Sequence, residues 1–368
     1  MFCRSWGDCW MSKLVFLEDV CDILDSQRVP VTSKNRNKGI YPYYGANGVQ
    51  DYVDDYIFDD ELVLLAEDGG NFGSTEKPIA YRTSGKCWVN NHAHVLKAKE
   101  CIDVDYLCYS LMFYNVSSIV NGATRQKLNQ SMMRKMIIPL PEMNEQHIIV
   151  SKLDKVTNAI KLCNTILEKL DLLVKSQFVE MFGDIRISSI FPNISLDNFA
   201  QIGSSKRVHA ADYVESGIPF YRSKEIIELG NGQEPSVELF ISKKQYECIR
   251  KTNGVPCKGD ILMSAVGTIG KMWIVDGQKD FYYKDGNIIS IHSEETNPIY
   301  LKEALANLID DFKSANVAGS AYSALTIVKL KKMTVPMPPI SLQNEFADFV
   351  QQIDKSKLAV KKTLEKAE

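Results

Sequence analysis

The chain has 368 residues, of which 45% are hydrophobic and 24% are charged, and its formal net charge at pH 7 is −3. This length is enough for two or three domains with cores of their own. The slightly acidic balance excludes binding of nucleic acid through a globally basic surface, so any DNA-binding surface must be a local patch.

The nine cysteines include no C-x-x-C pair, and the five histidines form no cluster of ligands. This usage favours reduced thiols in a cytoplasmic protein over a disulfide framework, and we expect no metal. No stretch approaches the roughly 20 apolar residues that span a bilayer, so we expect no membrane contact. Residues 1–13 are interpreted as an N-terminal extension, because Arg4 and Asp8 break the pattern of a signal peptide and Met11 is an alternative start.

Residues 14–140 predict a first globular domain of mixed α/β structure. The runs at 56–68 and 87–98 are β-rich and end in turn residues, whereas 17–24 and 103–120 have helical spacing. DNA-contacting side chains are expected in its polar, basic loops at Lys34, Arg36, Lys38, Tyr44, Asn47, Asn91 and His92.

The end of this domain, residues 122–141, combines four cations with no acidic residue, at Arg125, Lys127, Arg134 and Lys135. Short polar side chains lie among them, at Thr124, Gln126, Asn129 and Gln130. Arg and Lys suit phosphate anchoring and amides suit base edges, so the stretch is a candidate DNA contact. A basic helix start exposed to water is the alternative interpretation.

Residues 141–183 predict a long helix of roughly 57 Å at 1.5 Å per residue. Its apolar positions recur in steps of four and three, which is the pattern of a helix that winds on a partner. This seam consists of Ile149, Leu153, Val156, Ile160, Cys163, Leu167, Leu170, Val174 and Met181.

Residues 184–338 repeat the plan of the first domain with different surface chemistry, so a second mixed α/β domain is expected. Its candidate DNA-contacting residues are Lys206, Arg207, Arg222, Ser223, Lys224, Thr268, Lys271, Asn287, Ser320, Tyr322 and Ser323.

Residues 339–368 predict a second long helix, with a seam at Phe346, Val350, Ile353, Lys357, Val360, Leu364 and Ala367. An exposed helix with so apolar a seam needs a partner, and the other such seam in the chain is the first one. We therefore expect an antiparallel two-helix coiled coil that joins the two domains. Lys357 departs from the apolar pattern. We expect it either to lie at an exposed end of the helix pair or to extend its charged ammonium group into solvent.

The two halves of the chain are related by a tandem duplication. Phe346 follows Ile149 by the same 197 residues by which Val350 follows Leu153. The motif K-M-x-x-P-x-P occurs at 135–141 and again at 332–338. Fainter matches pair LEDVCDI with LDNFAQI, YPYY with IPFY and GNFGS with GTIGK. The chain is thus one unit repeated: a globular domain followed by a long helix.

Motifs of several enzyme classes do not occur: there is no G-x-G-x-x-G and no phosphate-binding P-loop. The sequence Asn297-Pro298-Ile299-Tyr300 is one residue away from the N-P-P-Y motif of adenine methyltransferases. The residues before it are acidic and polar instead of a buried strand, which favours a turn that starts a helix.

Two variable domains, each followed by K-M-x-x-P-x-P and a long helix, resemble the specificity subunit of a type I restriction–modification system. GATRQKLNQ at 122–130 and PEMNEQ at 141–146 are similar to the signatures of that family, although the second copy has GSAYSALTI in place of GATRQKLNQ.

The resemblance implies two target-recognition domains, at 14–140 and 184–338, that read the two halves of a bipartite double-stranded DNA target. The helix pair would set the distance between the halves and dock two methyltransferase subunits and the motor–nuclease subunits. S-adenosylmethionine, ATP and Mg²⁺ would bind those partners, and this chain would carry neither catalysis nor cofactor.

Three alternatives stay open at this point. One is the specificity subunit of a system in which methylation and cleavage share one polypeptide. Another is a DNA methyltransferase in its own right, and the third is a coiled-coil scaffold without a DNA role.

Overall fold

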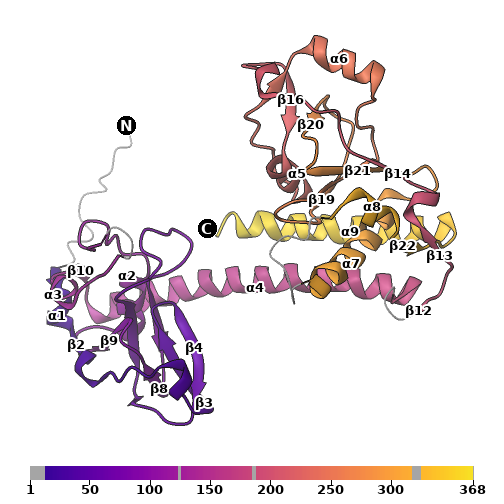
Figure 1. Ribbon diagram of the computed structural model, residues 1–368. Coiled ribbons are helices and arrows are strands. Elements are labelled where there is room, and N and C mark those ends of the chain that lie inside the picture. Colours follow the sequence, from indigo (N-terminus) through magenta and orange to yellow (C-terminus); the bar gives the residue numbers. More distant parts are fainter. Residues whose placement is uncertain (1–12, 123–125, 185–187, 317–324, 368) are drawn as a thin grey trace, which may run out of the picture. The chain divides into compact units, whose positions relative to one another are not determined.

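A computed structural model describes residues 13–122, 126–184, 188–316 and 325–367 of the chain (Figure 1). The chain forms two compact units that meet between Ala159 and Ile160, inside the long helix α4 (Met143–Phe182). Among the helices of this described part, none has both the length and the apolar character that crossing a bilayer requires.

The described part of the first unit contains two four-stranded sheets, the two-stranded pair β1–β10, three short α-helices and two 3-10 helices before α4. Its elements are β1 (Lys13–Phe16), α1 (Leu17–Val20), β2 (Cys21–Ile23), η1 (Asp25–Gln27), η2 (Ser33–Asn35), β3 (Lys38–Gly45), β4 (Gly48–Val53), β5 (Phe58–Asp59), β6 (Leu62–Ala66), β7 (Ala80–Thr83), β8 (Lys86–Val89), β9 (Ala93–Ala98), α2 (Val104–Met112), α3 (Gln130–Arg134) and β10 (Ile137–Leu140).

Strand β6 is the centre of this unit, because all five of its residues are buried. It lies in a sheet of order β2-β9-β6-β7, and a second sheet has the order β4-β3-β8-β5 with β3 and β8 parallel. Strand β1 pairs with β10, which brings the start of the domain beside its end. The predicted mixed α/β domain is confirmed.

The second unit repeats this plan. Its elements are β11 (Gly183–Asp184), β12 (Ser188–Ser189), β13 (Asn193–Ser195), η3 (Leu196–Asn198), β14 (Gln201–Gly203), η4 (Ala210–Asp212), β15 (Tyr213–Val214), β16 (Ile218–Tyr221), α5 (Ser223–Gly230), β17 (Phe240–Ile241), α6 (Lys243–Thr252), β18 (Ile261–Ser264), β19 (Met272–Ile274), β20 (Tyr282–Tyr283), β21 (Ile288–His292), α7 (Pro298–Asn316), α8 (Ile327–Lys331), β22 (Thr334–Pro336) and α9 (Ile340–Leu364).

The strand pairings bear out the duplication beyond the helices. The sheet β14-β21-β18-β19 has the same order as β2-β9-β6-β7, and β13 pairs with β22 as β1 pairs with β10. The faint match of YPYY to IPFY is also structural, because β3 and β16 each form the parallel pair of their unit, with β8 and β20.

One buried glutamine anchors the start of the long helix in each unit. The Gln146 Nε2 donates to the Pro141 carbonyl over 2.9 Å, and its Oε1 accepts from the backbone at the start of α2 over 2.7 Å. Gln343 makes the same two bonds, to the Pro338 carbonyl over 2.9 Å and from the backbone before α7 over 2.8 Å. The repeated K-M-x-x-P-x-P-x₄-Q pattern thus encodes one joint used twice.

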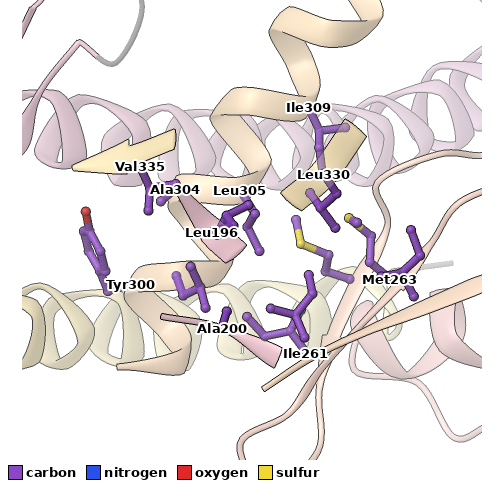
Figure 2. Packing of buried hydrophobic residues seen from close by; sticks show 14 of the residues in the cluster. Leu196, Ala200, Ile261, Met263, Tyr300, Ala304, Leu305, Ile309, Leu330 and Val335 are labelled. Atoms are coloured by element: carbon purple, nitrogen blue, oxygen red, sulfur yellow. The ribbon is translucent and has the colours of Figure 1, made fainter. Parts of the chain in front are cut away.

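In the second unit, α9 runs antiparallel to the C-terminal part of α4, as predicted (Figure 1). The Phe346 ring meets Phe182 and Phe178 at centroid distances of 5.4 and 5.5 Å, and Lys357 pairs with Asp171 eleven residues further on. The rest of this core comes from the sheet β14-β21-β18-β19 and from α7 and α8. Ala304, Leu305 and Leu330 are among the core side chains drawn in Figure 2.

The helix seam differs from the prediction at Leu153 and Val156, which are 37% and 41% exposed. The reason is length: α9 has 25 residues against 40 in α4, and the contact register places its last residue, Leu364, opposite Asn164. From Ile160 onward, the seam positions of α4 are buried or half-buried. Ile149 packs instead on the core of the first unit.

Two further predictions are corrected by the strands. Only Leu17–Val20 of the predicted helix 17–24 is helical, because Cys21–Ile23 pairs with β9. The helix predicted at 103–120 ends at Met112. The turn at Asn297 does start α7, and the Tyr300 ring is fully buried, with its hydroxyl 2.6 Å from the Pro336 carbonyl. That tyrosine is therefore part of the core and not of a methyltransferase site.

Candidate nucleic-acid interface

The first unit contains a cavity of about 510 Å³ beside the β3–β4 hairpin. Four residues predicted from the sequence line it: Arg36, Asn47, Asn91 and His92. They come from three separate loops, so the fold brings together side chains that lie up to 56 positions apart in the chain. Tyr44 is close in sequence but half-buried, with its ring on Tyr81 at 5.7 Å.

The charged residues of the cavity are engaged with one another. The Arg36 guanidinium lies 4.0 Å from the centre of the Tyr43 ring, donates to the Val31 carbonyl and lies 3.4 Å from an Asp51 oxygen. His92 Nδ1 lies 2.5 Å from Asp68 Oδ1. The Arg36 charge is therefore compensated by Asp51, and the Asp68 carboxylate has a hydrogen-bond partner in His92.

Two further lysines, here called the rim lysines, are close in sequence to the cavity-lining Arg36 but do not themselves line the cavity. Lys34 in η2 and Lys38 at the start of β3 are exposed, and no ion pair of theirs occurs in the described part of the chain. They flank Arg36 on either side in sequence. Exposed cations that are close in sequence to a cavity-lining residue are candidates for contacts with DNA phosphates.

The basic stretch at the end of the domain is held in place by acidic residues. Lys127 Nζ lies 3.0 Å from Glu67 Oε1, and the Leu128 N–H donates to the Glu67 carbonyl. Asn129 caps α3 by accepting from the Met132 N–H, whereas Gln126 is exposed. Thr124 and Arg125 lie outside the described residues.

Behind this stretch is a buried charge network. The buried His94 lies between the Asp25 carboxylate, 2.6 Å from Nδ1, and the Leu128 carbonyl, 2.8 Å from Nε2. Burial alone would raise the pKa of the Asp25 carboxyl, but hydrogen bonds and charge from His94, the Val95 N–H and Arg28 lower it below its usual range.

Asp25, Glu67 and His94 have the donor atoms of a metal site, and these atoms lie within 4.8 Å of one another. However, Arg28 lies 2.7 Å from a Glu67 oxygen, and Lys127 lies 3.0 Å from the other. These two cations already compensate the carboxylates, so the donor set fits an internal salt network better than a metal ion.

The second unit has a cavity of about 500 Å³ with a different lining. Of the predicted residues, Lys206 contributes to it, and its backbone N–H donates to the Tyr282 hydroxyl over 2.7 Å. The remaining polar lining is rich in hydroxyls and includes Ser204, Ser205, Asn253, Tyr283, Ser290 and His292.

Other predicted residues of this unit lie elsewhere. Arg222 pairs with Glu225 and Glu238, Lys224 also pairs with Glu238, and Ser223 starts α5 with a buried hydroxyl. Arg207 is exposed and pairs with Asp285; Thr268 and Lys271 are exposed in the loop between β18 and β19, and Asn287 is half-buried. Ser320, Tyr322 and Ser323 lie outside the described residues.

The comparison with known families decides what this architecture is. The model of the type I restriction–modification DNA specificity domain matches residues 11–172 and again 191–367. The chain belongs to this family. Each match spans one globular domain and its long helix, in agreement with the internal duplication.

Relatives and solved structures agree with this assignment. A putative type I restriction enzyme specificity subunit of Haemophilus influenzae is 31% identical over 344 residues, which cover 92% of this chain and 86% of the relative. The EcoprrI specificity subunit of Escherichia coli is 24% identical over 133 residues, or 35% of this chain and 32% of that one.

Among solved structures, the crystal structure of the S subunit of a type I restriction–modification system from M. genitalium has a TM-score of 0.60 at 15% identity. It covers 99% of this chain and 95% of its own. A structure from work on assembly and conformational transition of the type I system has a TM-score of 0.53 at 16% identity, covering 96% and 94%. At these identities the likeness shows the fold.

Sequence reasoning missed two residues in the first specificity domain, Gln50 and Asn90. Both line the cavity and are bonded to each other, with Asn90 Nδ2 donating to Gln50 Oε1 over 3.0 Å. The available signal was the turn Gly45-Ala46-Asn47-Gly48, which predicts a hairpin and thus a strand end that carries Gln50.

Proposed function

We propose that this chain is the non-catalytic, DNA-recognition subunit of a type I restriction–modification complex, in which each unit reads one half of a bipartite target. What carries the proposal is the contrast between the two copies. The joint of Gln146 and its counterpart Gln343 is retained, whereas the cavities lie at different parts of the repeated fold, beside the β3–β4 hairpin in the first unit and beside β14 and β21 in the second, and have different linings. This pattern is expected of two domains that share one fold but recognise different DNA sequences.

The long helices are proposed to dock the methyltransferase and motor–nuclease subunits. In the second unit, α4 exposes Leu162 by 59%, Leu172 by 62%, Leu173 by 44% and Val179 by 44%. Exposed apolar side chains in number on one helix are a common feature of partner surfaces. S-adenosylmethionine, ATP and Mg²⁺ belong to those partners in this proposal, and the complex acts in the cytoplasm, where DNA is present.

The test of DNA recognition uses the rim lysines. The full chain is purified with its methyltransferase partner, and its affinity for duplex DNA is measured over a range of salt concentrations. Lys34→Ala with Lys38→Ala should weaken binding and reduce the slope of log affinity against log salt by about 0.9 for each phosphate that is no longer neutralised. Lys13→Ala with Lys77→Ala, at exposed positions of the first unit that do not line the cavity, is the matched control. Equal salt slopes in all three proteins would count against phosphate binding by the rim lysines.

The test of the spacing role lengthens α4 at its exposed stretch. Seven alanine-rich residues inserted after Asn158 add about 10 Å, which corresponds to roughly three base pairs. We expect the methylated target, read by sequencing of methylated adenines, to keep its two half-sequences and to gain a longer unread spacer. An unchanged spacer with full activity would rule out a helix that sets the separation.

A further inference from the structure

The amide side chains of the first cavity are not equivalent, and their hydrogen bonds decide which can meet a ligand. Asn90 is 3% exposed and has both ends of its amide engaged: Nδ2 donates to Gln50 Oε1 and Oδ1 accepts from the His92 N–H over 2.8 Å. It is a structural member of the lining. The three amides that remain, on Asn47, Gln50 and Asn91, are all exposed.

Each of these exposed amides keeps at least one hydrogen-bond donor or acceptor that is not used within the described residues of the protein. Asn47 Nδ2 donates to the Gly69 carbonyl over 3.0 Å, which leaves its Oδ1 as an acceptor. Gln50 uses Oε1 and keeps Nε2 as a donor. For Asn91, no hydrogen bond of the side chain occurs in the described part of the chain, so its donor and its acceptor both remain available in the cavity lining.

The backbone is built to hold Gln50 in this place. In the β3–β4 ladder, Tyr43 pairs with Asp51 and Tyr44 pairs with Val49, so Gln50 is the extra residue of a β-bulge. Its side chain folds over Gly45, where an added Cβ atom would overlap the Gln50 Nε2. Any other residue at position 45 would displace this amide, which explains the glycine.

The charged side chains of the cavity already have partners within the protein. An arginine fork is the usual reader of guanine, but Arg36 is held on the Tyr43 ring and by Val31 and Asp51. A carboxylate can accept from cytosine, but Asp68 is bonded to His92. What remains is a set of neutral amides, and the base edge that presents an acceptor beside a donor, as an amide does, is the N7 and N6 edge of adenine.

We infer that the first unit selects an adenine in its half of the target through Asn91, with Asn47 and Gln50 as neighbouring contacts and Lys34 and Lys38 on the flanking phosphates. The inference rests on the proposed function and adds to it the base class and the residues that read it. The hydroxyl-rich cavity of the second unit has a different lining, so the same preference is not transferred to the other half.

The first experiment compares methylated motifs. Cells express the full chain with its methyltransferase partner, as wild type, Asn91→Ala, Asn91→Asp or the control Asn115→Asp, at an exposed position of the first unit outside the cavity and the long helices. Both Asn91 variants should lose roughly tenfold in preference for adenine at one position of one half-site, with the other half unchanged. The control should reproduce the wild-type motif. An unchanged motif in both variants, or a change at a G·C pair, would overturn the inference.

The second experiment probes the base edge directly. Equilibrium binding of the purified complex is measured on the wild-type target in which the adenine is replaced by 7-deazaadenine, which lacks N7, or by purine, which lacks the 6-amino group. Each analogue should weaken the wild type by several-fold and leave Asn91→Ala nearly unaffected. Equal losses in the two proteins would mean that Asn91 does not touch this edge.

The outcomes separate this inference from the proposed function. If the wild-type complex shows no sequence-selective methylation, the proposed function itself fails. If it is selective and sensitive to the rim lysines but indifferent to Asn91, the proposed function stands and the adenine-reading role is wrong. Thermal denaturation of each variant establishes that a lost preference does not reflect an unfolded domain.

Discussion

Lys357 Nζ lies 2.7 Å from Asp171 Oδ1 across the paired stretch of α9 and α4. The lysine occupies a seam position, where its side chain is only 21% exposed. Burial alone would lower the pKa of Lys357, but the hydrogen bond and charge of Asp171, together with Asp354, raise it above its usual value. A cation thus replaces an apolar side chain in the seam without breaking the helix pair, because a carboxylate on the facing helix compensates it.

This pair predicts a stability that fades at alkaline pH. A group with a raised folded-state pKa stabilises fully below its unfolded pKa, about 10.4 for lysine, and this contribution is lost as the pH rises through the folded value. Asp171→Asn should lower the thermal midpoint at pH 7 and show a smaller further loss above pH 10 than the wild type. Glu168→Gln, on the same helix, should do neither. Identical pH profiles for all three would contradict the role of the pair.

The buried glutamine joint predicts a matched pair of destabilised variants. Gln343→Leu leaves the backbone N–H of Asn297 and the carbonyl of Pro338 without their partner, which should cost roughly 1–3 kcal/mol in the free energy of unfolding. Gln146→Leu should have a similar effect in the first unit. Gln351→Leu on the exposed side of α9 is the control in urea denaturation. If the control is as damaging as Gln343→Leu, the two bonds do not carry the stability.

The buried Asp25 predicts sensitivity of the first unit to acid. Since its pKa is lowered in the folded chain, it contributes stability above the unfolded value of about 3.9, and this contribution is lost as the pH falls through the folded value. Asp25→Asn should cost roughly 2 kcal/mol at pH 7 and flatten the loss of stability below pH 4. The exposed Asp22→Asn should leave the acid transition of the wild type intact, as followed by circular dichroism. Parallel acid transitions in the two variants would argue against the network.

The cysteines predict a pattern of chemical labelling. Burial raises the pKa of the Cys21 and Cys108 thiols to about 12, so the reactive thiolate is scarce at neutral pH. In a background with Cys3 and Cys9 replaced by serine, a thiol reagent should modify three residues quickly in the native protein, namely Cys101, Cys248 and Cys257. The buried thiols should react only after denaturation. Rapid modification of Cys21 or Cys108, mapped by mass spectrometry, would contradict their burial.

The parts of the fold that could be predicted from the sequence are those that repeat or have a period. The seam of α4 and α9, the duplication and the antiparallel pairing follow from residues such as Val350 at fixed steps, because burial of one helix face imposes that spacing. The strand Cys21–Ile23 could not be predicted, since its short run has helical spacing and is decided by pairing with β9.

The candidate site was predictable in its residue types but not in its bonding. Arg36, Asn47, Asn91 and His92 were all expected from the sequence, and they do line one cavity. That Arg36 lies on the Tyr43 ring depends on loops brought together by the fold, and no local pattern encodes it. The bulge at Gln50 is likewise a property of strand register.

The joint formed by Gln146 in one unit and Gln343 in the other has a consequence for how new specificities can arise. Because the chain enters and leaves each globular unit through matching strand pairs, β1 with β10 and β13 with β22, the two ends of the segment between them lie side by side in both units. We expect a chimera to keep the glutamine joint if the inserted segment comes from a related domain and retains the apolar residues that pack on the long helix. Such exchange of a whole segment would change the cavity lining in one step.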